Sequence, residues 1–428
     1  MPRSTTSRDC LRCVAEVAVA EQAALSPRLL AHAPHRLLFF VGALNVLLAM
    51  GWWLLWLVDA RWQLIGLPSA TPFGGWIHAF VMQYQLLPPF MFGFLMTTFP
   101  RWTGMPDLSR WHYVPVGLGL LGGQLSVIGG MLCGQAAMVH VGAIMSLAGW
   151  SYGLAQLLRV LLAERRAGRG PTWHAWSCFA ALGFGLAGLL SMAVFLHGDN
   201  PWAVFISIKL GTFGLLLPAY LTVAHRMFPF FAGNVVPGYR AWRPMWLLAA
   251  MWALLLAHLG LELVHGYAWL WPVDAAFAAG TASVLWRWWP RAPAPGILRV
   301  LFAGFAWLPV PFALYAVQSA VYAVSGAFVL GRGPAHALFI GFFGSLLVAM
   351  VTRVTQGHSG RPMHMPVAGW FAFIALQAVA VVRIAAEVAP DGYAWQALAA
   401  AGWLLAFLPW VLRSLSIYLR PRADGRPG

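Results

Sequence analysis

Histidine is the side chain most able to do chemistry in this sequence. The chain has 13 histidines but only 12 aspartates and glutamates among its 428 residues. A neutral imidazole can be buried at low cost, and it ligates haem iron, copper and zinc. The chain therefore has few carboxylates for a proton relay, whereas it has enough histidines to bind a cofactor.

Cysteine offers a weaker signal. Cys10 and Cys13 form a C-x-x-C pair near the N-terminus, and Val14 rather than a histidine follows them, so the pair is not a c-type haem attachment site. A single C-x-x-C is weak evidence for metal binding. Because Cys133 and Cys178 lie in apolar stretches, the cysteines predict no disulfide framework.

The composition predicts which elements must position the histidines. Hydrophobic residues make up 61% of the chain and charged residues 9%, against about 45–50% and about 25% in soluble domains. Apolar runs of about 20 residues recur, each long enough to cross a bilayer as a helix. We expect an all-α polytopic membrane protein. A soluble enzyme, a disordered chain, a disulfide-rich secreted domain and a nucleic-acid binder all fit poorly.

Apolar windows predict about twelve transmembrane helices. The long ninth window contains Pro309 and Pro311, so a kink is expected there. The predicted spans are 37–58, 76–99, 113–133, 138–162, 174–197, 203–224, 243–264, 267–289, 297–325, 335–356, 366–388 and 393–418.

The basic residues predict the orientation. Placing the N-terminus in the cytoplasm puts most of the 27 lysines and arginines on the cytoplasmic side, as the positive-inside rule requires. The same rule accounts for the net charge of +15. We expect both termini to be cytoplasmic, with a basic N-terminal tail at 1–36, a transmembrane domain at 37–418 and a C-terminal tail at 419–428.

This topology sorts the histidines into two layers. A single histidine at a membrane interface is usually hydrated or hydrogen-bonded, so position alone does not make a ligand. His32 and His35 fall in the predicted tail. The outer half holds His78, His140, His197, His258, His265 and His336, and the inner face holds His112, His174, His225, His358 and His364.

One group of polar residues repeats at helical spacing in the seventh predicted span. His258, Glu262 and His265 share a helix face. That spacing suits a metal site, and it suits a polar stripe at the membrane interface better.

Three parts of the chain together resemble the NnrS family of bacterial membrane proteins. Their order and the span count agree with the family over nearly the whole chain. They lie at the end of the second span, at the end of the sixth span, and in the tenth span with the loop after it. They read FLMTTFPRWTG from Phe94, HRMFPFF from His225, and HALFIG from His336 with MVTRVTQGHSGRP from Met350.

One departure from the family concerns the second span. In the family this span usually opens H-x-H-E-M, whereas here it reads His78-Ala79-Phe80-Val81-Met82. If the second histidine and the glutamate contribute to a metal site in the family, this chain has lost ligands there.

The resemblance implies a haem- and copper-containing protein of the bacterial inner membrane, linked to nitric oxide and denitrification. It implies His78 and His336 as cofactor and metal ligands, with His197 as the next candidate, because all three lie on one side of the membrane. Three such histidines from three helices could hold a haem iron and leave a ligand for copper. At the inner face, the resemblance marks His225 and His358 as cofactor-binding residues.

Three arginines lie beside the inner motif histidines, namely Arg226, Arg353 and Arg361. Arginine pairs with carboxylates in a bidentate manner, as haem propionates require. The alternative is that these residues only hold loops on the cytoplasmic side. We expect the His225 motif to dock near the segment 357–361 in one shared site.

More than one function is compatible with these features. The leading hypothesis is a haem and copper protein that binds, senses or detoxifies nitric oxide in the lipid bilayer, and the residues indicate no catalytic step. The alternative is a transporter of a metal, haem or nitrogen-oxide species, because twelve spans with both termini inside is a common carrier layout. A third possibility is an assembly partner for a respiratory complex.

Overall fold

The computed structural model describes residues 23–68 and 72–426. These residues fold into helices, with no strand among them, which confirms the predicted all-α class. Cys10 and Cys13 lie outside the described residues.

The structure contains helices of three kinds. The π-helices are η2 (Val81–Leu86), η3 (Leu210–Leu216) and η5 (Ala337–Gly344), and the 3₁₀-helices are η1 (Pro27–His32) and η4 (Tyr267–Trp269). The α-helices are α2 (Pro34–Trp62), α3 (Gly74–Phe80), α4 (Pro88–Thr103), α5 (Arg110–Cys133), α6 (Ala136–Arg166), α7 (Trp173–Gly198), α8 (Pro201–Lys209), α9 (Leu217–Val235), α10 (Met245–Leu263), α11 (Leu270–Trp288), α12 (Gly296–Phe305), α13 (Pro309–Ser325), α14 (Gly333–His336), α15 (Ser345–His358), α16 (Val367–Ala385) and α17 (Gly392–Tyr418).

Within the described residues, eleven helical segments are long and apolar enough to cross a membrane. The chain is therefore a multi-pass membrane protein. The remaining predicted span, 267–289, is helical as α11 but is not among the eleven. Asp274 and Arg287 lie in this helix and lower its hydropathy.

α11 nevertheless runs the full height of the bundle. Near its start, the Trp271 backbone N–H donates to Ser319 Oγ at 2.9 Å, where α13 approaches its end. At its other end, Trp288 Nε1 donates to the carbonyl of Trp242, just before α10, at 2.8 Å. α11 therefore runs antiparallel to α10 and brings the chain back to the end of the bundle at which α10 began. α12 starts at that same end.

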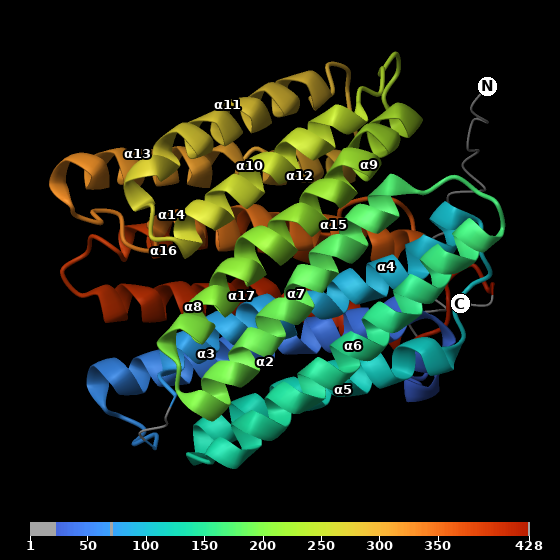
Figure 1. Ribbon diagram of the computed structural model, residues 1–428. Helices are drawn as coiled ribbons and strands as arrows, with labels where there is room; N and C mark the ends of the chain where they lie inside the picture. The colour runs from blue at the N-terminus through green and yellow to red at the C-terminus, as the bar shows by residue number, and fades with distance from the viewer. Residues whose placement is uncertain (1–22, 69–71, 427–428) are drawn as a thin grey trace.

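The two described ends of the chain lie at the same end of the bundle (Figure 1). The Ser26 backbone N–H donates to the Leu419 carbonyl at 2.8 Å, and Arg36 Nη1 donates to the Arg420 carbonyl at 2.8 Å. A chain that starts and finishes at one end crosses an even number of times. Eleven apolar crossings plus α11 satisfy this condition.

The predicted kink in the ninth span is confirmed. The segment divides into α12 and α13, with a turn at 306–308 between them. Pro309 begins α13, because proline has no N–H to continue the hydrogen-bond ladder of the preceding helix.

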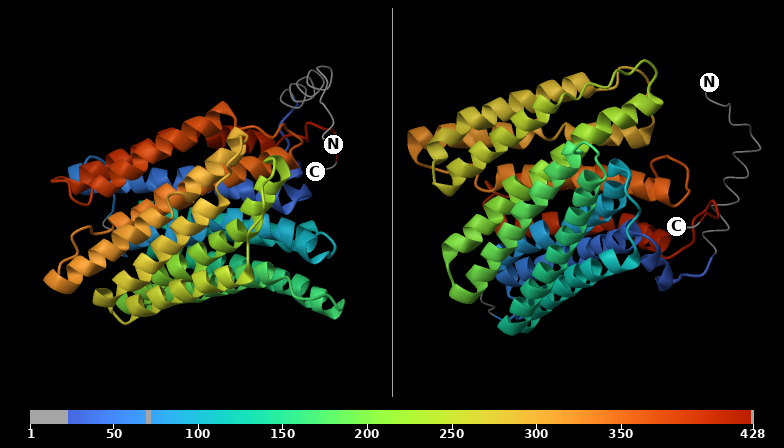
Figure 2. Two further views of the ribbon diagram at one scale, coloured as in Figure 1. Left: turned by 90° about the horizontal axis from the view of Figure 1, so that it is seen from above. Right: turned by 45° about the vertical axis from the view of Figure 1, so that its right-hand side comes forward.

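Three membrane-crossing segments form the centre of the bundle. In the apolar 18-residue stretch of each segment, 89% is buried for Gly74–Thr103, 78% for Gly333–His358 and 67% for Pro201–Val235, whereas the value is at most 61% for the other candidate spans. Each central segment contains one of the three π-helices of the described chain. π-Helical turns inside α-helices are often found at functional sites. Figure 2 shows the helices packed side by side as one bundle.

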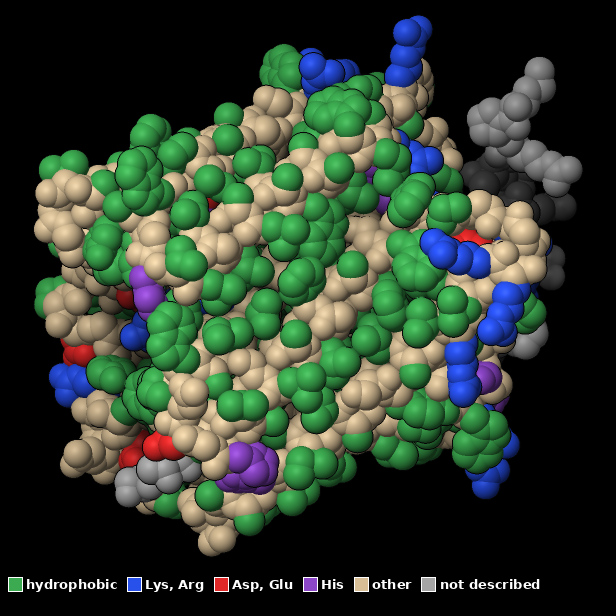
Figure 3. Space-filling view, in the orientation of Figure 1, with side chains coloured by type: hydrophobic (Ala, Val, Ile, Leu, Met, Phe, Trp, Pro, Cys, Tyr) green, Lys and Arg blue, Asp and Glu red, His purple; other side chains and the backbone are tan. Residues whose placement is uncertain are grey.

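The surface of the bundle matches a lipid environment. Apolar side chains cover most of the face in Figure 3, while lysine and arginine side chains gather mainly toward the end that carries the two termini. Exposed leucine, isoleucine and valine side chains such as Leu118, Ile144 and Leu405 lie in the middle of long helices. This arrangement agrees with the arginine segregation on which the predicted orientation rests.

Glycine sets the close approach of α5 and α6. A Cβ atom on Gly119 would lie 2.6 Å from Gly149 Cα, and one on Gly149 would lie 3.0 Å from Gly119 Cα. Small residues at such crossings let membrane helices pack backbone against backbone.

Replacing Gly119 with alanine should destabilise the protein by about 1–3 kcal/mol, because the new methyl group meets backbone that cannot move aside. Thermal unfolding in detergent measures the effect. Gly183→Ala is the matched control, since a Cβ there meets nothing within 4 Å. A Gly119→Ala protein as stable as this control would contradict the packing described.

The orientation can be tested with reporter fusions. Fusions after Gly170 and after Ala292 should report the cytoplasm, and fusions after Gly198 and after Gly266 should report the opposite side. The reason is that α7 and α11 each cross the membrane between the paired positions. If the fusions after Gly170 and Gly198 reported the same side, α7 would not cross the membrane, and the same holds for Gly266, Ala292 and α11. Either result would contradict the two-layer arrangement of the histidines.

Candidate functional site

A cavity of about 480 Å³ lies between the central segments, at the end of the bundle opposite the termini. Its walls come from α2, α3, η2, α8, η3, α13, η5, α16 and α17, together with Arg332 and the end of α14. Most of the lining is apolar. Five of the polar side chains in the lining can be charged, namely His78, Lys209, Arg332, His336 and Arg383. We call this space the outer cavity.

His78 is held in the wall of the outer cavity by aromatic packing. Its ring stacks on Trp53 of α2, with the ring centroids 4.1 Å apart and the planes 16° apart. α3 approaches α2 closely because Gly74 lacks a side chain, since a Cβ there would lie 2.4 Å from the Trp56 ring. His78 Nδ1 is buried and has no hydrogen-bond partner among the described residues.

His336 reaches the same cavity from the other side. It ends the short helix α14, immediately before η5. Its Nδ1 lies 3.0 Å from the Arg332 carbonyl oxygen. Because a carbonyl can only accept, Nδ1 carries the proton and Nε2 keeps a free lone pair. The ring is thus fixed in the tautomer that a metal ligand requires.

Cations line the cavity beside the two histidines. Arg383 Nη1 donates to Glu387 Oε1 at 2.6 Å, and this arginine side chain is only 7% exposed. The Arg332 backbone N–H donates to the other oxygen of Glu387 at 3.0 Å. Lys209 also lines the cavity and lies 2.8 Å from Glu262. The three cations of the lining outnumber the two glutamates that pair with them, so the cavity has a small excess of positive charge.

His197 lies elsewhere at the same end of the bundle. Its side chain is exposed, its Nδ1 donates to the Ala193 carbonyl at 2.9 Å, and its ring meets His140 at a centroid distance of 4.8 Å. Both ring nitrogens of His140 face carbonyl oxygens, of Ala136 and Leu196, at 2.8 Å. The structure does not bring His197 to the outer cavity.

The inner motif histidine His225 is enclosed by protein partners. Its Nε2 donates to the Pro244 carbonyl at 3.1 Å, and its Nδ1 accepts from His174 Nε2 at 2.9 Å. The donor and acceptor roles follow from the carbonyl, which can only accept. Both ring nitrogens are therefore already used, and His225 is fully buried.

His358 belongs to a different group of contacts. Its ring lies 4.2 Å from that of His35, and Arg422 Nη1 donates to its carbonyl at 2.8 Å. His225 and His358 thus have different neighbours, and none of these contacts joins them in the shared site predicted from the sequence. His35 was expected in the tail, but it lies in the first turn of α2, which begins at Pro34. A proline at the first helical position is the signal for that start.

The segment 357–362 docks the C-terminal end of the chain. The Ala423 N–H donates to the Ser359 carbonyl at 2.9 Å. Gly360 has a φ of +68°, and a Cβ there would lie 2.6 Å from the Asp424 carboxyl carbon. A hydrogen bond from Arg422 lowers the pKa of Asp424 to about 2. This motif therefore has a structural role at the inner end.

The three arginines singled out at the inner face have separate surroundings. Arg226 lies over the Trp102 ring at 4.6 Å, and Arg353 lies over the Phe231 ring at 3.9 Å. Arg361 is 5% exposed. The first two contacts connect ends of the central segments through cation–π attraction.

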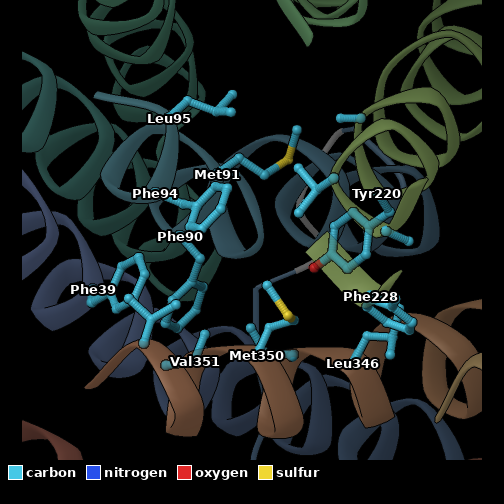
Figure 4. Close-up of a pocket in the computed structure, with 15 residues that line it drawn as sticks. Phe39, Phe90, Met91, Phe94, Leu95, Tyr220, Phe228, Leu346, Met350 and Val351 are labelled. Carbon is cyan, nitrogen blue, oxygen red and sulfur yellow. The ribbon is translucent and has the colours of Figure 1, made fainter. Parts of the chain in front are cut away.

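A second, apolar cavity of about 70 Å³ lies between α4, α9 and α15 (Figure 4). The sulfur atoms of Met91 and Met350 and the hydroxyl of Tyr220 point into this space, with Phe90 and Phe228 in its wall. We call it the central cavity.

The positions that depart from the family motif do not line the outer cavity. Phe80 is 2% exposed and packs on Tyr84 at a centroid distance of 5.5 Å, and Val81 is fully buried. Phe80 and Val81 are therefore packed away from the cavity that His78 lines. Within residues 23–68 and 72–426, no three His, Cys, Asp or Glu side chains form a group that could hold a metal ion.

Of the three polar residues predicted to share a face of α10, two lie together inside the protein. His258 and Glu262 turn inward, whereas His265 leaves the helix with a φ of +54° and bonds the Tyr267 hydroxyl at 2.6 Å. The inward pair meets Asp274 of α11, which the sequence analysis did not single out. The available signal was an acidic residue inside a predicted span, which lipid disfavours.

Comparison with known families identifies one match. A family model described as NnrS protein matches residues 29–422, nearly the whole chain. No curated protein matches the sequence.

The placement of the histidines predicts their reactivity toward diethyl pyrocarbonate. His197 and His265 are exposed and should be modified quickly in detergent, whereas His258, which is fully buried, should stay unmodified. Mass spectrometry of peptides measures each site, with urea-unfolded protein as the control for complete reaction. Equal rates at His258 and His197 would contradict the placement.

Proposed function

The chain belongs to the NnrS family, and we propose that it is a membrane haem protein that handles nitric oxide, with His78 and His336 as ligands of the haem iron. The observation that carries the proposal is that these two histidines reach one cavity of about 480 Å³ from separate central segments. Ligand cavities in proteins are typically about 300–1,000 Å³ and mostly apolar with a few polar groups.

The residues of the outer cavity fit a haem. A buried ring nitrogen without a partner, as at His78 Nδ1, is costly, and ligation of that imidazole to a metal offsets the cost. His336 offers a free Nε2 lone pair. Arg332 in the same lining supplies positive charge for a propionate, whereas Arg383 already pairs with Glu387. When bound, the haem would supply an iron centre that exchanges electrons and binds small gases.

The chain's own residues have distinct tasks in this proposal. Trp53 holds the His78 ring in place by stacking, and the Arg332 carbonyl fixes the tautomer of His336. The apolar walls exclude water, which strengthens each charge interaction inside the cavity. The proposal names no catalytic step, so an enzymatic activity is not part of it.

The central cavity supports nitric oxide as the ligand class. Nitric oxide is a small molecule of low polarity, and apolar cavities in proteins accept such guests. A volume of about 70 Å³ between three central segments suits a diatomic molecule. The resemblance also supports placement in a bacterial inner membrane, and the segregation of the basic residues supports cytoplasmic termini; both are part of the proposal.

Copper is the second metal that the family implies, and the described residues do not fit it. They contain no group of three suitable side chains, and Phe80 and Val81 occupy the positions of the family's His and Glu. The inner residues His225, His358, Arg226, Arg353 and Arg361 also support a cofactor less well, because the ring nitrogens of His225 already have partners.

Replacing His78 or His336 with alanine should lower haem occupancy by at least about tenfold, since even the partners of metal ligands have effects of that size. The Soret absorbance relative to total protein measures occupancy. His197→Ala is the matched control, because its ring is exposed and outside the cavity.

The opposite result has a clear meaning. Unchanged haem content in both cavity variants, or loss of haem only in His197→Ala, would remove the assignment of ligands. A purified wild-type protein without colour or iron would instead favour a transporter.

A further inference from the structure

Four ionisable side chains form a buried network beside the outer cavity. Lys209 Nζ lies 2.8 Å from Glu262 Oε2, His258 Nε2 lies 3.5 Å from Glu262 Oε1, and His258 Nδ1 lies 2.6 Å from Asp274 Oδ1. The residues come from α8, α10 and α11. His258 and Asp274 are fully buried, and Glu262 is 3% exposed.

The charges of this network do not balance without an extra proton. One lysine and two carboxylates sum to a net charge of −1 when His258 is neutral, and to zero when it is an imidazolium. A low-dielectric interior strongly disfavours unbalanced charge. The network can therefore hold one proton, and it holds that proton more readily as the charge of the ligand in the outer cavity becomes less positive.

The geometry connects the network to the cavity at one end only. Lys209 lines the outer cavity, and its side chain is 23% exposed. Asp274 Oδ2 is buried and has no hydrogen-bond partner in the described structure. A path that opens at Lys209 and ends at Asp274 is a store for a proton and not a channel across the membrane.

His258 is the group of the network that holds the proton. An imidazole can accept a proton on one ring nitrogen while the other keeps its hydrogen. A proton taken up on Nε2, which lies 3.5 Å from Glu262 Oε1, makes His258 an imidazolium, and the contact of Nδ1 with Asp274 at 2.6 Å stabilises this form. The Phe213 ring, 3.9 Å from the His258 ring by centroids, keeps water from this face.

The other groups that face the network carry no charge near neutral pH. Tyr315 of α13 meets the His258 ring edge-on, with a centroid distance of 5.4 Å, and also lines the outer cavity. Tyr267 lies near Glu262 and shares a hydrogen bond with His265, which is exposed. The proton therefore belongs to the four-residue network.

We propose that Lys209, Glu262, His258 and Asp274 form a proton store that takes up a proton when the ligand in the outer cavity gains an electron. The added negative charge favours the imidazolium form, and loss of the electron returns the proton to the cavity through Lys209. The electron comes from a one-electron donor that is oxidised in the same step, and the proton enters from solvent at Lys209, so one proton is taken up for each electron that the cavity ligand receives. The coupling to an electron rests on the proposed haem function.

The store itself is tested on the full-length protein without reference to any cofactor. Infrared difference spectra between two pH values should contain carboxyl and imidazole bands from the network. Glu262→Gln and Asp274→Asn should each remove bands, because either change neutralises the network without the extra proton. Asp391→Asn is the control, since Asp391 is an exposed partner of Arg61. Wild-type spectra with no titrating buried carboxyl or imidazole would overturn the store.

The coupling is tested by the midpoint potential of the haem as a function of pH. In the wild type the potential should fall as pH rises, with a slope approaching one proton per electron, because uptake becomes harder. Glu262→Gln and Asp274→Asn should flatten this slope, while Lys209→Arg should preserve it. Either isosteric variant suffices if the other fails to fold.

The outcomes separate the two proposals. A haem-containing wild type whose potential is independent of pH would overturn the store as a partner of the cavity, with the haem assignment intact. A wild type without a Soret band would remove the haem assignment, and the infrared spectra would then decide the store alone. A slope that persists in both isosteric variants would show that the proton binds elsewhere.

Discussion

The structure depends on one constraint, which is that lipid offers no hydrogen-bond partners to a polar group inside the membrane. Pro88 and Pro89 illustrate it, because a proline has no N–H to donate to the carbonyl four residues earlier. Asn45 Nδ2 instead donates to the Gln85 carbonyl at 2.6 Å. Polar side chains are thereby drawn to the central segments, where other protein groups can satisfy them.

The π-helices follow from the same constraint. Each interrupts the regular hydrogen-bond ladder in a central segment, where side chains from neighbouring helices can compensate. Between η2 and η3, for example, Gln83 Nε2 donates to Thr212 Oγ1 at 3.0 Å. Both residues line the outer cavity. The π-helical turns therefore place polar side chains that bond one another in the wall of the outer cavity.

Histidines at similar depth in the bundle have very different hydrogen-bond and packing partners. At the inner end, His225 bonds His174 and a carbonyl, while His358 packs on His35. At the opposite end, the pair that reaches the cavity combines one ring nitrogen that has no hydrogen-bond partner among the described residues with one fixed tautomer. Depth in the membrane is therefore a poor guide to ligand character, whereas the partners of each ring nitrogen are a good one.

The sequence by itself determined the class of fold, the kink at Pro309 and the family, because apolar run length, proline chemistry and local motifs are properties of contiguous residues. It also singled out His78 and His336 through their motifs. Only the tertiary structure decided that these two share a cavity while His197 does not, that His225 and His358 have different neighbours, and that Asp274 faces His258. Such pairings join residues on separate helices, and the rotation of each helix about its axis is set by packing against its neighbours, which no single stretch of sequence encodes.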